Sequence, residues 1–277
     1  MDFQKGSARM KTSETRFRSR HLKPAFDLVI TLILWAYFTA GFVLFFSPFY
    51  LAAFLFSGNR ERAFQRLNHQ FYRGFFKLLR ILVPATLWNI HDDVLSIRSS
   101  VIVCNHISYL DSILMISLFE QHRTIVKSRF FKIPIFRRII ELSGYIPSTS
   151  EGNLSDLVIQ RIEEMDCFFE GGGNLFIFPE GTRSRSGAIG QLNKGAFKIA
   201  RMSQRPIKVL LCLHTDKLFP PGKFLFNTCF EGTISVEALA SIEPDYQRER
   251  PSVSGLMTQV RSLLETEHSK HLNREDL

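Results

Sequence analysis

The sequence predicts an α/β fold: a layered, mostly parallel sheet flanked by helices, preceded by a hydrophobic helix or hairpin and a basic amphipathic helix. One observation predicts the α/β domain: after Pro84, short β-branched and apolar runs alternate with helical stretches. Such alternation produces a sheet with helices on both faces. The N-terminal part is predicted by one long apolar segment and a helical periodicity that follows it. A chain of 277 residues is long enough for one sizeable domain and an appendage.

The segment from Phe26 to Phe56 has Asp27 as its only charged residue. It exceeds the about 20 residues that span a bilayer, whereas two spans need about 40. Pro48 predicts a kink or break in this helix. The segment lacks the cleavage site of a signal peptide, so we expect it to be retained. Basic residues flank both ends, which fits both ends on the cytoplasmic face. A re-entrant hairpin and a single tilted span both remain open.

The stretch from Arg60 to Leu82 has apolar side chains at three- and four-residue steps and basic side chains largely on the other side. The apolar positions are Phe64, Leu67, Phe71, Phe75, Leu78 and Leu82. This pattern predicts a basic amphipathic helix in the lipid headgroup region. The alternative is a helix packed on the soluble domain with a solvated basic face.

The remaining elements follow from short apolar runs and helical periodicity. The predicted strands are 100–104, 123–127, 144–147, 174–178, 207–213 and 229–236, and the predicted helices are 110–119, 134–142, 154–169, 191–203 and 253–268. The chain therefore divides into a basic arm (1–25), membrane-anchoring helices (26–82), a catalytic domain (83–245) and a charged C-terminal helix and tail (246–277).

The net charge of +9 favours anionic partners: nucleic acid, anionic lipid headgroups or phosphorylated substrates. The four cysteines have no C-x-x-C spacing. They are therefore expected to be reduced core thiols and not a disulfide or zinc framework.

Two polar stretches each come at the end of a predicted buried strand. Asn105–Asp111 comes directly after the apolar run 101–104. Phe178–Arg183 begins at the last residue of the apolar run 175–178. Open α/β sheets build their sites at such strand ends. Together the two stretches predict a histidine general base beside a cationic, anion-binding loop.

His106 and Asp111 are the candidate acid–base pair. An imidazole, with a reference pKa of about 6.5, can accept a hydroxyl proton near neutral pH. If a helix begins after His106, the carboxylate of Asp111 folds back towards the ring and fixes its tautomer. Asn105 and Ser108 suit the capping of that helix. The alternative is that His106 and Asp111 only cap and stabilise the helix.

The second stretch supplies a turn at Gly181, a hydroxyl at Thr182 and a guanidinium at Arg183, a group that grips phosphate. A third stretch, Lys127–Pro134, carries three cations among aromatic residues. It lines an acceptor pocket, touches a membrane or forms a solvated basic face. The sequence has no G-x-S-x-G nucleophile and no cluster with metal-ligand spacing, so no metal is expected.

Asn105–Asp111 resembles the NHxxxxD signature of the glycerophospholipid acyltransferases, typified by 1-acylglycerol-3-phosphate acyltransferase. Phe178–Arg183 resembles their FPEGTRS block, Lys127–Pro134 their second block, and Arg205–Val209 their closing proline block. The blocks occur in order over roughly residues 100–212.

The resemblance implies transfer of a fatty acyl group from acyl-CoA or acyl-carrier protein to the hydroxyl of a lysophospholipid, with no cofactor. His106 would be the general base, and Asp111 would support it. The implied substrate-binding residues are Asn105, Ser108, Lys127, Glu180, Gly181, Thr182 and Arg183. The implied setting is a bacterial-type inner membrane with the catalytic domain on the cytoplasmic face. The expected partners are then membrane lipids, and no nucleic-acid partner is expected.

The sequence departs from the family at one position. The second block usually ends in an arginine assigned to the acceptor phosphate, and Ser150 stands there in this chain. Acylation of a non-phosphatidic lysolipid, such as a lyso-aminolipid, therefore stays open. So does a non-catalytic lipid-binding protein on the same fold. Nucleic-acid binding through the positive charge explains neither the apolar segment nor the paired motifs.

Overall fold

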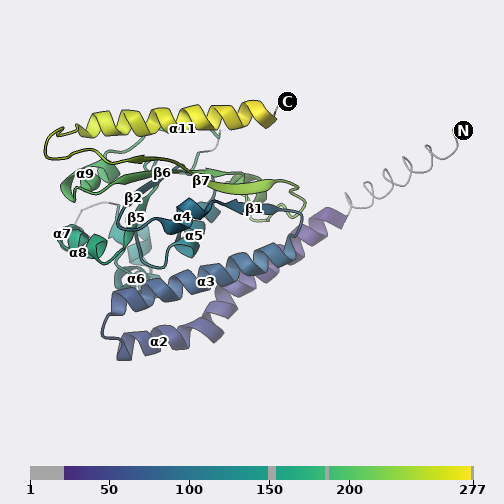
Figure 1. Ribbon diagram of the computed structural model, residues 1–277. Helices are drawn as coiled ribbons and strands as arrows, with labels where there is room; N and C mark the ends of the chain where they lie inside the picture. Colours follow the sequence, from purple (N-terminus) through teal and green to yellow (C-terminus); the bar gives the residue numbers. More distant parts are fainter. Residues whose placement is uncertain (1–21, 149–153, 185–186, 276–277) are drawn as a thin grey trace, which may run out of the picture.

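The computed structural model describes residues 22–148, 154–184 and 187–275 (Figure 1). Its centre is a seven-stranded sheet in the order β1-β7-β6-β2-β5-β3-β4. The strands are β1 (Leu87–Ile90), β2 (Val101–Cys104), β3 (His122–Val126), β4 (Ile146–Pro147), β5 (Asn174–Ile177), β6 (Ile207–Leu213) and β7 (Thr233–Ile242).

The predicted, mostly parallel sheet is confirmed. β2 pairs parallel with β5 and β6, and β3 pairs parallel with β4 and β5. β7 runs antiparallel to β6, and β1 pairs parallel with β7. The carboxyl ends of β2, β3, β4, β5 and β6 therefore meet at one edge of the sheet.

Two strand predictions need correction. β1 is absent from the predicted strands because its four residues alternate between exposed and half-buried positions, with no buried apolar run. The last strand is not at 229–236 but at Thr233–Ile242. The part beyond residue 236 includes Glu237 and Ser241, and pairing with β6 keeps this polar stretch extended.

The side chains of β2 point alternately into two cores, as the period of a strand requires. Ile102 and Cys104 face the first core, and Val101 and Val103 face the second. Helices cover both faces. They are α3 (Arg60–Leu82), α4 (Asp92–Ser96), α5 (Tyr109–Leu118), α6 (Pro134–Leu142), α7 (Ser155–Glu163), α8 (Met165–Glu170), α9 (Gly195–Met202), α10 (Thr215–Leu218) and α11 (Val253–Glu275), with a short 3₁₀ turn η2 (Ser128–Lys132).

Figure 1 shows α9 and α11 on one side of the sheet and α3, α4 and α5 on the other. Leu256, Val260 and Leu264 of α11 are buried in the second core. The C-terminal segment, which the sequence separates from the catalytic domain, thus completes the core of that domain. The helix predicted at 154–169 is interrupted at Glu164, between α7 and α8.

α3 is helical over the predicted residues, but its apolar face is not turned to a headgroup region. Phe64, Phe71, Phe75, Phe76 and Leu79 are all buried. They pack in the interior of the protein, against the apolar N-terminal helix and the first core. The alternative reading, a helix packed on the domain with a solvated basic face, is therefore the correct one.

The apolar segment forms a helix over Leu22–Phe56, the one helix in the described ranges that is long and apolar enough to cross a membrane. It widens to a π-helix, η1 (Tyr37–Phe46), and returns to an α-helix, α2 (Ser47–Phe56), with Pro48 in the first turn. Pro48 thus lies at the start of α2, directly after the π-helical stretch, and Figure 1 shows the helix bending where it leads into α2.

Polar contacts hold this helix to the rest of the protein at both ends. Near its start, the Asp27 carboxylate accepts hydrogen bonds from the backbone N–H and the hydroxyl of Thr228, at 2.9 and 2.6 Å. Near its end, the Tyr50 hydroxyl donates to the side chain of Asn68 on α3, at 2.6 Å. The chain then reverses and returns as α3. Leu22–Phe56 and α3 form a helical hairpin that lies along the domain.

The four cysteines are unpaired. Cys104 and Cys212 are buried in the core, as predicted, whereas Cys167 and Cys229 are exposed. Of the four thiols, two therefore belong to the core.

Candidate active site

The sheet brings the two predicted stretches together. β2 and β5 are neighbours, and Val103 lies opposite Ile177, so both strands end at the same level. Asn105–Asp111 and Phe178–Arg183 therefore leave the sheet side by side. β6 lies on the other side of β2 and ends at Leu213, at the same edge.

Asp111 both caps a helix and holds the histidine. Its Oδ2 accepts hydrogen bonds from Nδ1 of His106 at 2.9 Å and from the backbone N–H groups of Ile107 and Ser108, each at 2.7 Å. Ser108 is the N-cap of α5, and with Asp111 it forms a capping box. The capping and the acid–base interpretations are thus satisfied by the same carboxylate.

These contacts fix the tautomer of His106. A carboxylate oxygen only accepts, so Nδ1 carries the proton and Nε2 keeps its lone pair. The imidazole stacks on Phe178 with ring centroids 4.3 Å apart, and its side chain is 14% exposed. The ring is therefore held on one side by Asp111 and on one face by Phe178. This is the geometry that a general base requires.

The second oxygen of Asp111 has donors from β6 and α10. Oδ1 accepts from the Thr215 hydroxyl, with the Cys212 thiol at 3.7 Å. Asp111 is fully buried, and these donors compensate its charge. Thr215 belongs to no predicted stretch. The signal that could have found it is its position just after a predicted strand that ends at the same edge.

Asn105 and Ser108 are implied substrate-binding residues, but the structure turns both inward. The Asn105 side chain accepts from the backbone N–H of Cys212 at 2.7 Å and donates to the carbonyl of Cys212 at 2.8 Å. The Ser108 hydroxyl donates to the carbonyl of Phe219 at 2.8 Å. Because both side chains are buried and bonded to backbone, they position the histidine loop and do not face a substrate.

Glu180 has the same kind of role. Its carboxylate accepts from the backbone N–H of His106 at 2.9 Å and from that of Gly190 at 2.8 Å. Burial raises the pKa of Glu180, while these two N–H groups and the nearby His106 oppose the rise and Asp111 adds to it. Glu180 thus joins the histidine loop to the loop around Gly190. Gly190 is a second contact of this site that the motifs did not indicate.

Gly181 has a backbone φ of 66°, in the left-handed region that favours glycine. A Cβ there would lie 3.1 Å from the amide nitrogen of Asn193, a residue that also bonds to the carbonyl of Pro179. The glycine therefore permits the turn that carries the chain from Glu180 to Thr182 and Arg183. Thr182 is exposed at this turn.

Arg183 reaches the histidine loop. Its guanidinium lies over the ring of Tyr109, with Cζ 3.2 Å from the ring centroid, as in a cation–π contact. Its Nη1 is buried and has no hydrogen-bond partner among the described residues. The backbone N–H of Ser184 donates to the carbonyl of His106 at 2.7 Å. A guanidinium with a donor that has no partner among the described residues thus lies against Tyr109, on the histidine loop, where it can bind an anion.

Lys127 lies further along the same edge. It is exposed and follows β3, which is separated from β2 by β5. The predicted arrangement therefore holds for His106, Asp111 and Arg183, whereas Lys127 belongs to a neighbouring surface.

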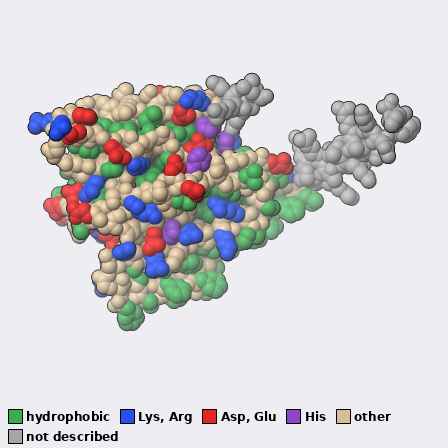
Figure 2. Space-filling view, viewed as in Figure 1, with side chains coloured by type: hydrophobic (Ala, Val, Ile, Leu, Met, Phe, Trp, Pro, Cys, Tyr) green, Lys and Arg blue, Asp and Glu red, His purple; other side chains and the backbone are tan. Residues whose placement is uncertain are grey.

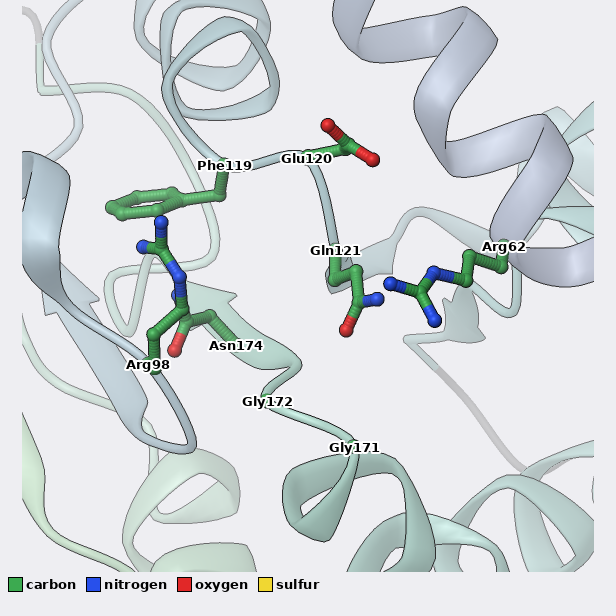
Figure 3. A pocket seen from close by; sticks show the side chains of 8 residues that line it. All are labelled: Arg62, Arg98, Phe119, Glu120, Gln121, Gly171, Gly172 and Asn174. Carbon is green, nitrogen blue, oxygen red and sulfur yellow. The ribbon is translucent and has the colours of Figure 1, made fainter.

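A pocket of about 350 Å³ opens at the opposite edge of the sheet, near Asn174 at the start of β5 (Figure 3). Arg62 and Gln121 face each other across it. Arg98 donates to the carbonyls of Leu95 and Ile97, at 2.9 and 2.6 Å. None of the predicted site residues lines this pocket, so it is separate from the candidate active site.

No group of three or more His, Cys, Asp or Glu residues that could hold a metal occurs in the parts of the chain that the structure describes.

Comparison with known proteins agrees with the geometry. Residues 88–210 match the family model described as Acyltransferase. The chain is 33% identical over 123 residues to the chloroplastic 1-acyl-sn-glycerol-3-phosphate acyltransferase BAT2 of Brassica napus, covering 44% of this chain and 35% of the relative. It is 25% identical over 172 residues to the 1-acyl-sn-glycerol-3-phosphate acyltransferase of Borreliella burgdorferi. This match covers 61% of this chain and 68% of the relative. The chain thus spans about a third of the length of the first of these relatives.

The fold also has a solved counterpart. The crystal structure of the 1-acyl-sn-glycerophosphate acyltransferase PlsC of Thermotoga maritima superimposes with a TM-score of 0.67 at 20% identity. The match covers 90% of this chain and 97% of that one, so the two proteins share a fold. Residues 88–210, which hold both motifs and the strands that join them, match the Acyltransferase family model, and the fold as a whole matches that of the PlsC structure.

Proposed function

We propose that this protein is a membrane-associated O-acyltransferase that moves a fatty acyl group from acyl-CoA or acyl-carrier protein to the hydroxyl of a lysophospholipid. The observation that carries the proposal is the hydrogen bond from Nδ1 of His106 to the buried Asp111, which leaves Nε2 as a base beside Arg183. The relatives are named for 1-acyl-sn-glycerol-3-phosphate, which makes this lysolipid the first acceptor to test.

The chemistry follows from this tautomer. Nε2 of His106 takes the proton of the acceptor hydroxyl as its oxygen attacks the thioester carbonyl. The C–S bond then breaks, an ester remains on the acceptor, and the imidazolium returns its proton to the leaving thiolate. Asp111 stabilises the imidazolium between the two steps, as the carboxylate of a catalytic triad does. No acyl-enzyme is needed.

The anion site is assigned to the turn after β5. Arg183 offers an unpaired donor next to the histidine loop, and the exposed Thr182 adds a hydroxyl at the same turn. A guanidinium binds phosphate with charge-assisted hydrogen bonds. We assign these two residues to the acceptor phosphate.

Membrane association is assigned to the apolar helix. Figure 2 shows hydrophobic side chains gathered along the lower edge of the molecule, over α2 and the helix that leads to it. Exposed apolar residues on this helix include Val43, Leu44, Phe45, Phe49, Leu51, Leu55 and Phe56. A contiguous apolar surface of this kind marks a membrane or protein contact.

The hairpin favours a helix that lies in the membrane surface over one that crosses the bilayer. Asp27 and Tyr50, near the two ends of the helix, are both bonded to the folded domain. A crossing helix would have to carry those partners into the hydrocarbon core. We place the helix in the interfacial layer, on the cytoplasmic face of a bacterial-type inner membrane.

The helix also lies close to the active site. The Ser108 hydroxyl donates to the carbonyl of Phe219, whose ring stacks on Phe226 at 4.4 Å. The backbone N–H of Phe226 donates to Thr31 on the apolar helix at 3.0 Å. This chain of contacts supports delivery of a single-tailed lipid from the membrane surface to His106.

The alternative acceptor rests on Ser150, which lies outside the described residues. If no arginine completes the phosphate site there, a lysolipid with a different headgroup, such as a lyso-aminolipid, fits the same chemistry. A non-catalytic lipid-binding protein is disfavoured because His106, Asp111 and Arg183 are all present and come together.

The test is an acceptor panel. The protein in lipid vesicles is incubated with acyl-CoA or acyl-carrier protein and with 1-acylglycerol-3-phosphate, other lysophospholipids or a lyso-aminolipid, and products are identified by mass spectrometry. We expect a diacyl product, first from 1-acylglycerol-3-phosphate. If no donor and acceptor pair gives product above the protein-free control, the proposed activity is wrong.

A further inference from the structure

The segment around the start of α6 presents an unusual surface. Residues 132–138 are exposed without interruption, and among them are Ile133 (49%), Ile135 (76%) and Phe136 (37%). Two apolar neighbours, Phe131 and Ile140, are buried and hold the segment to the core. Single exposed apolar residues are common, but three within four positions form a patch.

The charge of this segment has one sign. Residues 127–140 contain Lys127, Arg129, Lys132, Arg137 and Arg138 and no acidic residue. Arg137 forms an ion pair with Glu141, one turn further along α6, with 2.7 Å between its Nε and the Oε1 of Glu141. The other four cations have no acidic partner within the part of the chain that the structure describes. We call Lys127–Arg138 the α6 patch.

The α6 patch lies at the same end of the molecule as α2. At the end of α6, Ser143 accepts hydrogen bonds from Gln65 and Asn68 of α3, at 3.0 and 2.8 Å. The same Asn68 side chain accepts from Tyr50 of α2 at 2.6 Å. α6 and α2 thus meet the same turn of α3, and Figure 1 shows α6 beside the end of α3 that is next to α2.

The patch also lies at the catalytic edge of the sheet. It begins immediately after β3, whose carboxyl end lies at the same edge as that of β2, which leads into His106. The active site is therefore flanked by the apolar helix, reached through Phe226 and Thr31, and by the α6 patch.

We propose that the α6 patch is a second membrane contact, which docks on an anionic lipid surface. Its apolar side chains would enter the boundary between headgroups and acyl chains, and its lysine and arginine side chains would bind headgroup phosphates. Each such cation near an anionic surface contributes about 1 kcal/mol. An apolar protein partner would explain the apolar residues but not the four cations beside them that have no acidic partner among the described residues.

This inference rests on the proposed membrane association and adds a mechanical consequence. A single helix lying in the interface fixes depth but leaves the protein free to rotate about the helix axis. A contact away from that axis removes the rotation. The α6 patch would therefore turn the catalytic edge of the sheet towards the lipid surface from which the acceptor comes.

The first test measures the position of the patch. A full-length protein with Cys167→Ser and Cys229→Ser carries an environment-sensitive fluorophore at Ile135→Cys, or at Met202→Cys as the control. Met202 is 65% exposed on α9, on the other side of the sheet. With vesicles of phosphatidylcholine and phosphatidylglycerol, we expect the fluorophore at residue 135 to shift to the blue and to be quenched by lipid-borne quenchers, and the one at residue 202 to stay in water.

The outcomes separate this inference from the proposed function. Vesicle binding is followed independently by sedimentation. If the protein sediments with vesicles but the fluorophore at residue 135 stays in water, the α6 patch is not a membrane contact, and the apolar helix alone suffices. Equal quenching at both positions also overturns it. If nothing sediments, membrane association fails altogether, while the acceptor panel in detergent still tests the chemistry.

The second test measures how much the cations of the α6 patch contribute to vesicle binding. Lys132→Gln with Arg138→Gln is expected to weaken partitioning to phosphatidylglycerol-containing vesicles about 30-fold, from about 1 kcal/mol for each cation. Binding to phosphatidylcholine alone should not change. The matched control, Lys198→Gln with Arg201→Gln, removes two exposed cations of α9. Equal losses in the two variants would show a general charge effect and overturn the assignment to this patch.

Discussion

At the scale of single residues, the site depends on how one buried carboxylate is shared. Oδ2 of Asp111 begins α5 by capping two N–H groups and orients His106, while Oδ1 accepts from Thr215. The backbone N–H groups of Ile107 and Ser108 hold the carboxylate in place against Nδ1 of His106. The orientation of the imidazole is therefore set by the folded backbone.

Thr215 offers a direct test of this arrangement. Thr215→Val keeps the shape but leaves Oδ1 of the buried carboxylate with only the weak Cys212 thiol donor, at a cost of about 1–3 kcal/mol. We expect a lower midpoint of thermal unfolding and slower acyl transfer, and Thr215→Ser, which keeps the hydroxyl, should restore both. If the valine variant transfers acyl groups at the wild-type rate, the hydroxyl does not support the pair.

His122 predicts a pH dependence of stability. It is fully buried, donates from Nδ1 to the carbonyl of Phe119 at 2.7 Å, and accepts at Nε2 from Tyr145 at 2.7 Å. Burial lowers its pKa from 6.5 to about 4. Between these values the unfolded chain binds a proton that the folded one does not. The stability contributed by neutral His122 is therefore complete above pH 6.5 and lost as the pH falls to about 4, by about 3 kcal/mol.

Denaturant unfolding in detergent, measured from pH 7 to pH 4, checks this. His122→Asn should be less stable than the wild type at pH 7 but should lose less stability on acidification. Part of the decrease in stability on acidification should remain in this variant, because burial also lowers the pKa of His69. Identical slopes in the two proteins would show that His122 does not cause the acid sensitivity.

At the scale of elements, the sequence predicts what is local and misses what depends on distant packing. α6 is found at its predicted residues, 134–142, because Pro134 marks its start. His106 and Asp111 lie five residues apart, so one capped helix start brings them together. Thr215 is 104 residues from Asp111, and only the order of β2 and β6 in the sheet joins them.

α3 is a second example of a feature that depends on distant packing and that the sequence did not decide. Its apolar stripe and basic face are equally compatible with a headgroup layer and with a protein core. What decides is the presence of a neighbouring helix, Leu22–Phe56, whose aromatic rings pack on Phe71 and Phe75. A helical periodicity identifies the buried face but not what buries it.

The apolar helix carries the membrane prediction. Phe45 and Phe56 are 68% and 84% exposed, and burying one such side chain in lipid contributes about 1.5–3 kcal/mol. Phe45→Glu with Phe56→Glu is expected to weaken vesicle binding at least a hundredfold in a sedimentation assay. Leu87→Glu with Leu95→Glu, at positions 63% and 41% exposed outside the hairpin, is the control. Equal weakening in both double variants would contradict the assignment.

At the scale of the whole molecule, buried polar contacts join the hairpin to the sheet. Asn68 bonds to Tyr50 of α2, to Ser143 after α6 and to Tyr145, which in turn bonds to His122 of β3. A second link runs from Glu61 on α3 to Arg123 on β3, at 2.7 Å. The hairpin and the edge of the sheet that carries His106 are therefore joined by buried polar contacts as well as by apolar packing.

Removing Asn68 should loosen this link. Asn68→Ala leaves buried hydroxyls of Tyr50, Ser143 and Tyr145 with fewer partners, at about 1–3 kcal/mol for each unsatisfied group. We expect a clear drop in the midpoint of thermal unfolding, whereas Asn89→Ala, at an exposed position, should have little effect. A midpoint unchanged by Asn68→Ala would mean that the hairpin is held by apolar contacts alone.

The most direct test of the account is acyl transfer by His106→Ala, compared with the wild type and with His91→Ala, which removes an exposed histidine. The three proteins are first shown to have the same far-ultraviolet circular dichroism and the same binding to vesicles. Formation of the diacyl lipid is then measured with the acceptor that the panel identifies. We predict that His106→Ala slows transfer by about 10²–10⁴, the usual contribution of a general base, and that His91→Ala does not. Transfer by His106→Ala at the wild-type rate would contradict the central claim.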